Sequence, residues 1–102
     1  MKSQFGERVR ELRERQNLYL RQVAPILEMD TAQLSKIEKG LRQIKREQIP
    51  ILANILKVES DELLMLWVAD QIIDVISGED VALKALRVAE KELISNRKKK
   101  EK

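Results

Sequence analysis

The sequence predicts an all-α protein, and three observations point to that class. Apolar side chains recur three or four residues apart along most of the 102-residue chain, which is the spacing of one face of a helix. Aromatic residues make up only 3% of the chain, and no long stretch alternates between apolar and polar residues as a strand does. A content of 43% hydrophobic and 36% charged residues is typical of a globular protein rather than a disordered one.

Helical spacing predicts six helices. They are expected over residues 4–16, 20–27, 31–39, 45–56, 60–77 and 80–96. Pro25 and Pro50 each fall beyond the first turn of an expected helix, where a proline costs about 3 kcal/mol relative to alanine. We therefore expect a kink or a shifted helix start at both prolines. The last residues, 97-RKKKEK-102, contain no apolar side chain and are expected to form a disordered basic tail.

The composition argues against an enzyme. The chain has no cysteine and no histidine, so thiolate metal sites, the commonest metal ligand and the commonest general base are all missing. We expect no metal, no cofactor and no small-molecule ligand. The longest unbroken apolar run covers residues 63–69, far short of the ~20 residues that cross a bilayer. With a polar N-terminus, this predicts a cytoplasmic protein without membrane contact.

Charge is distributed in three blocks along the chain. Residues 1–57 contain 12 Lys and Arg against 7 Asp and Glu, residues 58–83 contain 7 acids and no base, and residues 84–102 contain 8 bases against 3 acids. Such blocks indicate surfaces that face different partners. Chance clustering on a solvated surface would give the same counts.

The helix expected over 31–39 is defined by its ends. Asp30 is placed to cap its first turn, Gln33 lies at the reciprocal capping-box position, and Gly40 is suited to the left-handed residue that ends it. Because so short a helix is marginal alone, Leu34, Ile37 and Leu41 are expected to anchor it in the core.

The outward side of this helix carries no acid. At 100° per residue, Ala32, Lys36 and Lys39 lie opposite Leu34, flanked by Gln33 and Ser35. A helix that enters the major groove of DNA needs a slim surface with hydrogen-bond donors and no carboxylate. An ordinary solvated face is the alternative. A short helix precedes it across the tight connection 27-LEMD-30, as in a helix-turn-helix, and the basic segment 41-LRQIKRE-47 follows.

Several segments together resemble the lambda repressor/Cro-like (XRE) helix-turn-helix family. They are 5-FGERVRELRERQNL-18, 23-VA-24, 34-LSKIEKG-40, 52-LANILKV-58 and 61-DELL-64, in the order and at the spacing of that family. The resemblance implies a five-helix DNA-binding domain over residues 1–66 whose third helix is the recognition helix. It also implies an ion pair between Arg13 and Glu38, which would hold that helix on its scaffold.

The same resemblance assigns contacts to double-stranded DNA. Base-reading positions would be Thr31, Ala32, Gln33, Ser35 and Lys36. Phosphate contacts would come from Lys39, Arg42, Gln43, Lys45 and Arg46. Near the start of the second helix, where this sequence departs from the family, Arg21 is expected to take over a phosphate contact. The sequence departs from the family pattern at Leu20, where glutamine is usual, and at Glu28, which stands at the turn glycine; Tyr19 and Pro25 are also atypical.

Residues 67–96 are expected to form a helical extension that covers the core and dimerises. Apolar residues occur all round the helix over 60–77, which indicates burial on all sides. A homodimer interface is predicted to include Leu66, Trp67, Ile73 and Ile76. A two-fold dimer would place two recognition helices about 34 Å apart and read a pseudo-palindromic operator. A monomer whose last helix folds back is the alternative.

These observations lead to three functional hypotheses. The first is a dimeric, autoregulatory transcription regulator; residues 20–40, 46–48 and 61–70 resemble controllers of restriction–modification genes. The second is an antitoxin-type protein that binds a toxin through its C-terminal helices and represses its own operon. The third is a protein-interaction module that has lost DNA binding, for which Leu20 and Glu28 are the arguments.

Overall fold

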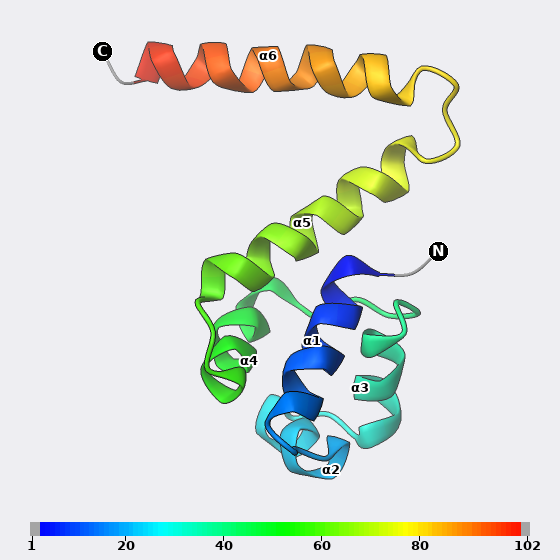
Figure 1. The fold of residues 1–102 in the computed structure, drawn as a ribbon, viewed down its shortest axis with the longest axis vertical. Coiled ribbons are helices and arrows are strands. Elements are labelled where there is room, and N and C mark those ends of the chain that lie inside the picture. The colour runs from blue at the N-terminus through cyan, green and yellow to red at the C-terminus, as the bar shows by residue number, and fades with distance from the viewer. Residues whose placement is uncertain (1–2, 101–102) are drawn as a thin grey trace. The chain divides into compact units, whose positions relative to one another are not determined.

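A computed structural model describes residues 3–100 of the chain and confirms the all-α class (Figure 1). No strand occurs within that range. The elements in chain order are α1 (Gln4–Arg15), α2 (Leu20–Val23), the 3₁₀ helix η1 (Ala24–Leu27), α3 (Thr31–Glu38), the 3₁₀ helix η2 (Arg46–Gln48), α4 (Ile49–Leu56), α5 (Ser60–Ile76) and α6 (Ala82–Lys100). Two compact units divide the chain between Gln71 and Ile72.

The first unit encloses one hydrophobic core. In it, α1 packs against both α3 and α4 (Figure 1). The buried apolar residues come from every helix of the unit except η2, and from the loop before η2: Phe5, Val9, Leu12, Val23, Ala24, Leu27, Leu34, Ile37, Ile44, Ile49, Leu52, Ala53, Leu56 and Leu63. Leu41 is not among them, because its side chain is 71% exposed. The expectation that it anchors α3 is therefore wrong, and the loop residue Ile44 is buried instead.

The two prolines act as helix starts. Pro25 lies in the first turn of η1, and Pro50 lies in the first turn of α4. A proline has no backbone N–H to donate, and in a first turn that N–H has no intrahelical acceptor anyway. The helix expected over 20–27 is accordingly split into α2 and η1, and the helix expected over 45–56 into η2 and α4. The predicted shifts at both prolines are confirmed.

Asp70 of α5 caps the N-terminus of α1. Its carboxylate accepts hydrogen bonds from the backbone N–H groups of Gln4 (2.9 Å) and Phe5 (3.0 Å) and from the hydroxyl of Ser3 (2.6 Å). The Ser3 oxygen in turn accepts from the N–H of Gly6 at 2.8 Å. A negative charge at this end of a helix also interacts favourably with the helix dipole. Asp70 thus ties α5 to α1 across more than sixty residues of sequence.

Replacing Asp70 with alanine is expected to lower the free energy of unfolding by about 1–3 kcal/mol, because the donors that it satisfies lose a charged acceptor. Urea denaturation followed by circular dichroism measures the change. Asp74→Ala is the matched control, since Asp74 is exposed on the same helix. Equal losses for the two variants would show that the cap contributes nothing specific.

The second unit contains the end of α5 and the whole of α6. The chain leaves α5 at Ile76, passes Ser77 and Gly78, and re-enters a helix at Ala82. This helix continues to Lys100 rather than ending near residue 96. The first part of the expected disordered tail, residues 97–100, is therefore helical, and residues 101–102 lie outside the described residues.

Candidate nucleic-acid interface

Both ends of α3 are fixed by local hydrogen bonds. The side chain of Asp30 accepts from the backbone N–H of Gln33 at 2.7 Å, which satisfies a free donor of the first turn. At the other end Gly40 has φ +79°, the N–H of Leu41 donates to the carbonyl of Lys36 at 2.8 Å, and the N–H of Gly40 donates to that of Ile37 at 3.1 Å. This is the Schellman pattern of helix ends. The predicted boundaries of this helix are correct to within one residue.

Two glycines let α1 and α3 approach closely. A Cβ atom on Gly6 would lie 2.6 Å from the carbonyl oxygen of Ile37, and one on Gly40 would lie 2.8 Å from the Cβ of Ser3. Either contact would force the backbones apart. These two positions therefore set how far α3 stands from its scaffold.

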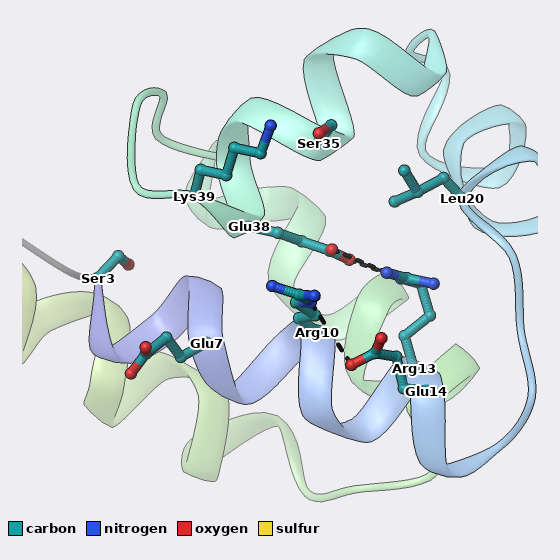
Figure 2. A pocket seen from close by; sticks show the side chains of 9 residues that line it. All are labelled: Ser3, Glu7, Arg10, Arg13, Glu14, Leu20, Ser35, Glu38 and Lys39. Atoms are coloured by element: carbon teal, nitrogen blue, oxygen red, sulfur yellow. Dashed lines mark hydrogen bonds and ion pairs between the residues drawn. The ribbon is translucent and has the colours of Figure 1, made fainter.

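An ion pair between α1 and α3 adds a second constraint. Arg13 donates from Nε and Nη2 to the two carboxylate oxygens of Glu38 at 2.7 and 3.0 Å (Figure 2). It also donates from Nη1 to the carbonyl of Leu18 at 2.8 Å. The side chains are only 12% and 5% exposed. Hydrogen bonding to Glu38 raises the pKa of the Arg13 guanidinium, against the opposing effect of burial. The structure thus contains the pair that the family resemblance implies, and the one acid of α3 is turned inward.

A pocket of about 460 Å³ lies beside this ion pair, between α1 and α3 and near the start of α2. Figure 2 shows the side chains that line it: Ser3, Glu7, Arg10, Arg13, Glu14, Leu20, Ser35, Glu38 and Lys39. Arg10 is within 3.5 Å of Glu14, on the same helix. With carboxylates and cations interleaved, its lining does not select for the charge of a ligand.

The residues predicted to read bases form one surface on α3. Thr31, Ala32 and Lys36 are exposed, while Gln33 and Ser35 are half-buried. None of the five contributes to the core. The surface that they form has two small side chains at its start and a lysine one turn later, so a groove wall can approach its first turn closely.

The predicted phosphate contacts lie beside that surface, on the C-cap of α3 and the segment that follows. Lys39, Arg42, Gln43, Lys45 and Arg46 are all exposed. Within residues 3–100, neither Lys36 nor any of the four cations among them takes part in an ion pair. Arg21 is exposed as well, and its guanidinium stacks 4.5 Å from the ring centroid of Tyr19. These cations are available to an external anion.

Gln48, which the sequence did not mark, and Trp67, which was predicted at a dimer interface, hold the basic segment in place. Gln48 donates from Nε2 to the carbonyl of Leu27 at 3.0 Å, and its Oε1 accepts from the backbone N–H of Lys45 at 3.1 Å. Trp67 donates from its indole nitrogen to the carbonyl of Ile44 at 3.0 Å. The loop between α3 and α4 is thereby fixed to η1 on one side and to α5 on the other.

Of the four residues predicted at a dimer interface, two pack against the core of the first unit and two do not. Leu66 and Trp67 are half-buried because they pack against the core of the first unit. Ile73 and Ile76 are half-buried. Other apolar residues of α5 are more exposed: Met65 (63%), Val68 (38%), Ile72 (44%) and Val75 (77%).

Glu28 occupies a left-handed conformation at the turn before α3. Its φ is +57° and its ψ is +41°, a region that costs a residue with a Cβ about 1–2 kcal/mol. Glu28 therefore adopts the left-handed backbone conformation for which the family pattern has glycine. Its exposed carboxylate also lies only three residues before the first turn of α3.

Glu28→Gly is expected to raise the free energy of unfolding by about 1 kcal/mol, since glycine adopts this conformation without strain. It should also tighten DNA binding by removing a carboxylate from the interface. Glu28→Gln separates the two effects, because it removes the charge but keeps the strained Cβ. Thermal unfolding and fluorescence anisotropy on labelled duplexes measure them; a glutamine variant as stable as the glycine variant would contradict the backbone argument.

Comparison with known proteins identifies the family to which this domain belongs. The family model described as a helix-turn-helix domain matches residues 4–67, a span that covers α1 to α4 and the first half of α5. No curated protein and no solved structure matches the chain. In residues 3–100, no cluster of acidic residues is arranged to hold a metal ion, and no helix has both the length and the apolar character needed to cross a membrane.

Proposed function

Because this chain belongs to the helix-turn-helix domain family, we propose that it is a sequence-specific transcription regulator that reads double-stranded DNA through α3. The observation that carries the proposal is the distribution of charge on that helix. Its one acid, Glu38, is buried against Arg13, whereas Lys36 on the outer side has no ion pair within residues 3–100. Such a surface can lie against a polyanion without repulsion.

The proposed roles follow from the chemistry of each exposed group. Lys36 donates to guanine acceptors, and the methyl groups of Thr31 and Ala32 meet thymine methyl groups in the major groove. Gln33 and Ser35 contribute hydrogen bonds at the edge of the same surface. Lys39, Arg42, Gln43, Lys45, Arg46 and Arg21 hold the phosphate backbone and thereby set the register of α3.

We further propose that the regulator acts as a homodimer in the cytoplasm. The exposed apolar side chains of Ile72 and Val75 on α5 support association, because clustered exposed apolar residues mark interaction sites. A two-fold dimer spaces its recognition helices about 34 Å apart and reads a pseudo-palindromic operator. We also propose that the protein regulates its own gene and controls restriction–modification genes.

Selection of bound duplexes from a random pool tests the proposal. A two-fold symmetric motif should emerge, and a gel shift on that motif should resist an excess of unrelated DNA. The same assay on the DNA directly upstream of the gene tests autoregulation. Recovery of no enriched sequence at low salt, from folded protein, would contradict sequence-specific regulation.

Arg42→Ala is expected to weaken binding to all sequences by a similar factor. Its exposed guanidinium on the loop after α3 is assigned to a phosphate, so its removal should reduce the slope of log K against log salt by about 1. Anisotropy titrations at several salt concentrations, on the selected duplex and on a scrambled one, measure that slope. A loss confined to the selected duplex would instead place Arg42 at a base.

A further inference from the structure

The helix α6 carries an apolar stripe that is half-buried at Ala82 and Leu86 and exposed at Ala89 and Leu93. Placed at 100° per residue, Ala82, Leu86, Ala89 and Leu93 fall within about 60° of one another. They follow the alternating spacing of four and three residues that defines the seam of a coiled coil. Leu93 is 68% exposed, and Leu83 and Ile94 beside the stripe are 70% and 50% exposed. Three lysines, Lys84, Lys91 and Lys98, lie on the opposite side.

Because α6 is exposed, it gains little stability from packing within its own unit. Every residue with a described side chain from Leu83 to Lys98, apart from Leu86, is exposed. In proteins most of the stability of a helix comes from tertiary packing of its amphipathic face, and α6 has little such packing within its unit. A partner laid along the apolar stripe would supply the missing burial.

Charge along the second unit selects an antiparallel partner. Glu79 and Asp80 precede the stripe, whereas Arg97 and Lys98 follow it. A parallel copy would place the acids beside acids and the bases beside bases. An antiparallel copy places the basic end of each helix beside the acidic start of the other, and complementary charges of this kind set helix orientation in coiled coils.

We infer that α6 forms a dimer interface of its own and that it pairs antiparallel with α6 of a second copy of this chain. In the register that buries the whole stripe, Leu86 packs against the partner's Ala89 and Leu93 packs against the partner's Ala82. Each layer then joins a large side chain to a small one, so the helices approach closely without a void. The pairing is symmetric about a two-fold axis, as an isologous dimer requires. The inference deepens the proposed homodimer and is independent of DNA binding.

Hydrodynamic measurements on the full chain without DNA test the interface. Sedimentation equilibrium should give twice the chain mass of 11.9 kDa. Leu93→Glu should weaken the dimer at least about tenfold, because it buries an unpaired carboxylate in the seam. Ser95→Glu is the matched control, since it adds the same charge on the opposite side of the helix and should leave the mass unchanged.

Crosslinking tests the orientation, and the chain contains no native cysteine that would interfere. A mixture of Ala82→Cys and Leu93→Cys proteins should be joined by a short bis-maleimide, whereas neither variant should crosslink to itself. Antiparallel pairing in this register separates each position from its own copy by 11 residues, or about 16 Å along the helix. Self-crosslinking of each variant would show a parallel pair and overturn the orientation.

The remaining outcomes separate this inference from the proposed function. If Val75→Glu on α5 dissociates the dimer while Leu93→Glu does not, the interface on α6 is overturned and the homodimer stands. A monomeric mass at every concentration overturns the interface and the homodimer together. Neither result removes sequence-specific binding as such, although a monomer would select a motif without two-fold symmetry; the selection experiment distinguishes these cases.

Discussion

Lys36→Glu is expected to abolish sequence-specific DNA binding while leaving the fold intact. Lys36 is exposed on the outer side of α3 and has no ion pair within residues 3–100, so the protein itself loses no interaction. On DNA the variant loses a donor to a base edge, which is worth about 1–3 kcal/mol, and presents a carboxylate to the polyanion instead. Together these effects should weaken binding to the selected duplex at least about 100-fold.

Anisotropy titration on the selected duplex measures this loss, and circular dichroism melting checks that the variant is folded. Lys84→Glu is the control, because it makes the same change of charge at an exposed position of α6, outside the family match. Its affinity should fall by much less. Unchanged binding by folded Lys36→Glu protein would remove α3 from the groove and with it the proposed mode of recognition.

The largest loss of stability is expected from Glu38→Ala. The change leaves the guanidinium of Arg13, which is 12% exposed, without its carboxylate partner, and breaking a buried ion pair from one side costs about 3–5 kcal/mol. Because α3 is held on α1 through this pair, DNA binding should be lost along with stability. Urea denaturation gives the free energy of unfolding.

A double variant distinguishes the cost of an unpaired charge from a general loss of packing. Arg13→Met combined with Glu38→Leu removes both charges and keeps apolar volume, so it should recover most of the stability that Glu38→Ala loses. A double variant as unstable as the single one would mean that the pair's charges are not the reason for the loss. Glu14→Ala provides the surface reference, since its pair with Arg10 is exposed on both sides.

Helix boundaries were predictable where local groups decide them. The cap on α1 at Ser3, the cap on α3 at Asp30 and the left-handed Gly40 all act through hydrogen bonds between residues a few positions apart. Both prolines likewise altered their helices through a backbone restriction that belongs to proline itself. Leu41 was predicted wrongly because helical spacing was continued past Gly40, where the chain has already turned away from the core.

Contacts between distant residues could not be predicted in the same way. Asp70 reaches the start of α1, Gln48 reaches the end of η1, and Trp67 reaches the loop between α3 and α4. No local pattern marks these partners, because their meeting depends on how whole helices pack. The pair of Arg13 with Glu38 was anticipated only through the family resemblance, and its burial came from the structure.

Local sequence is sufficient to specify the helical class, the ends of α3 and the acid-free composition of its outer side, since each depends on residues within a turn or two of one another. The packing of the helices, by contrast, turns Glu38 inward onto Arg13, leaves the loop cations without an ion pair among residues 3–100, and leaves Ala89 and Leu93 of the α6 stripe exposed. Those outcomes depend on which surfaces meet, and a chain's local preferences do not specify that until its helices have packed.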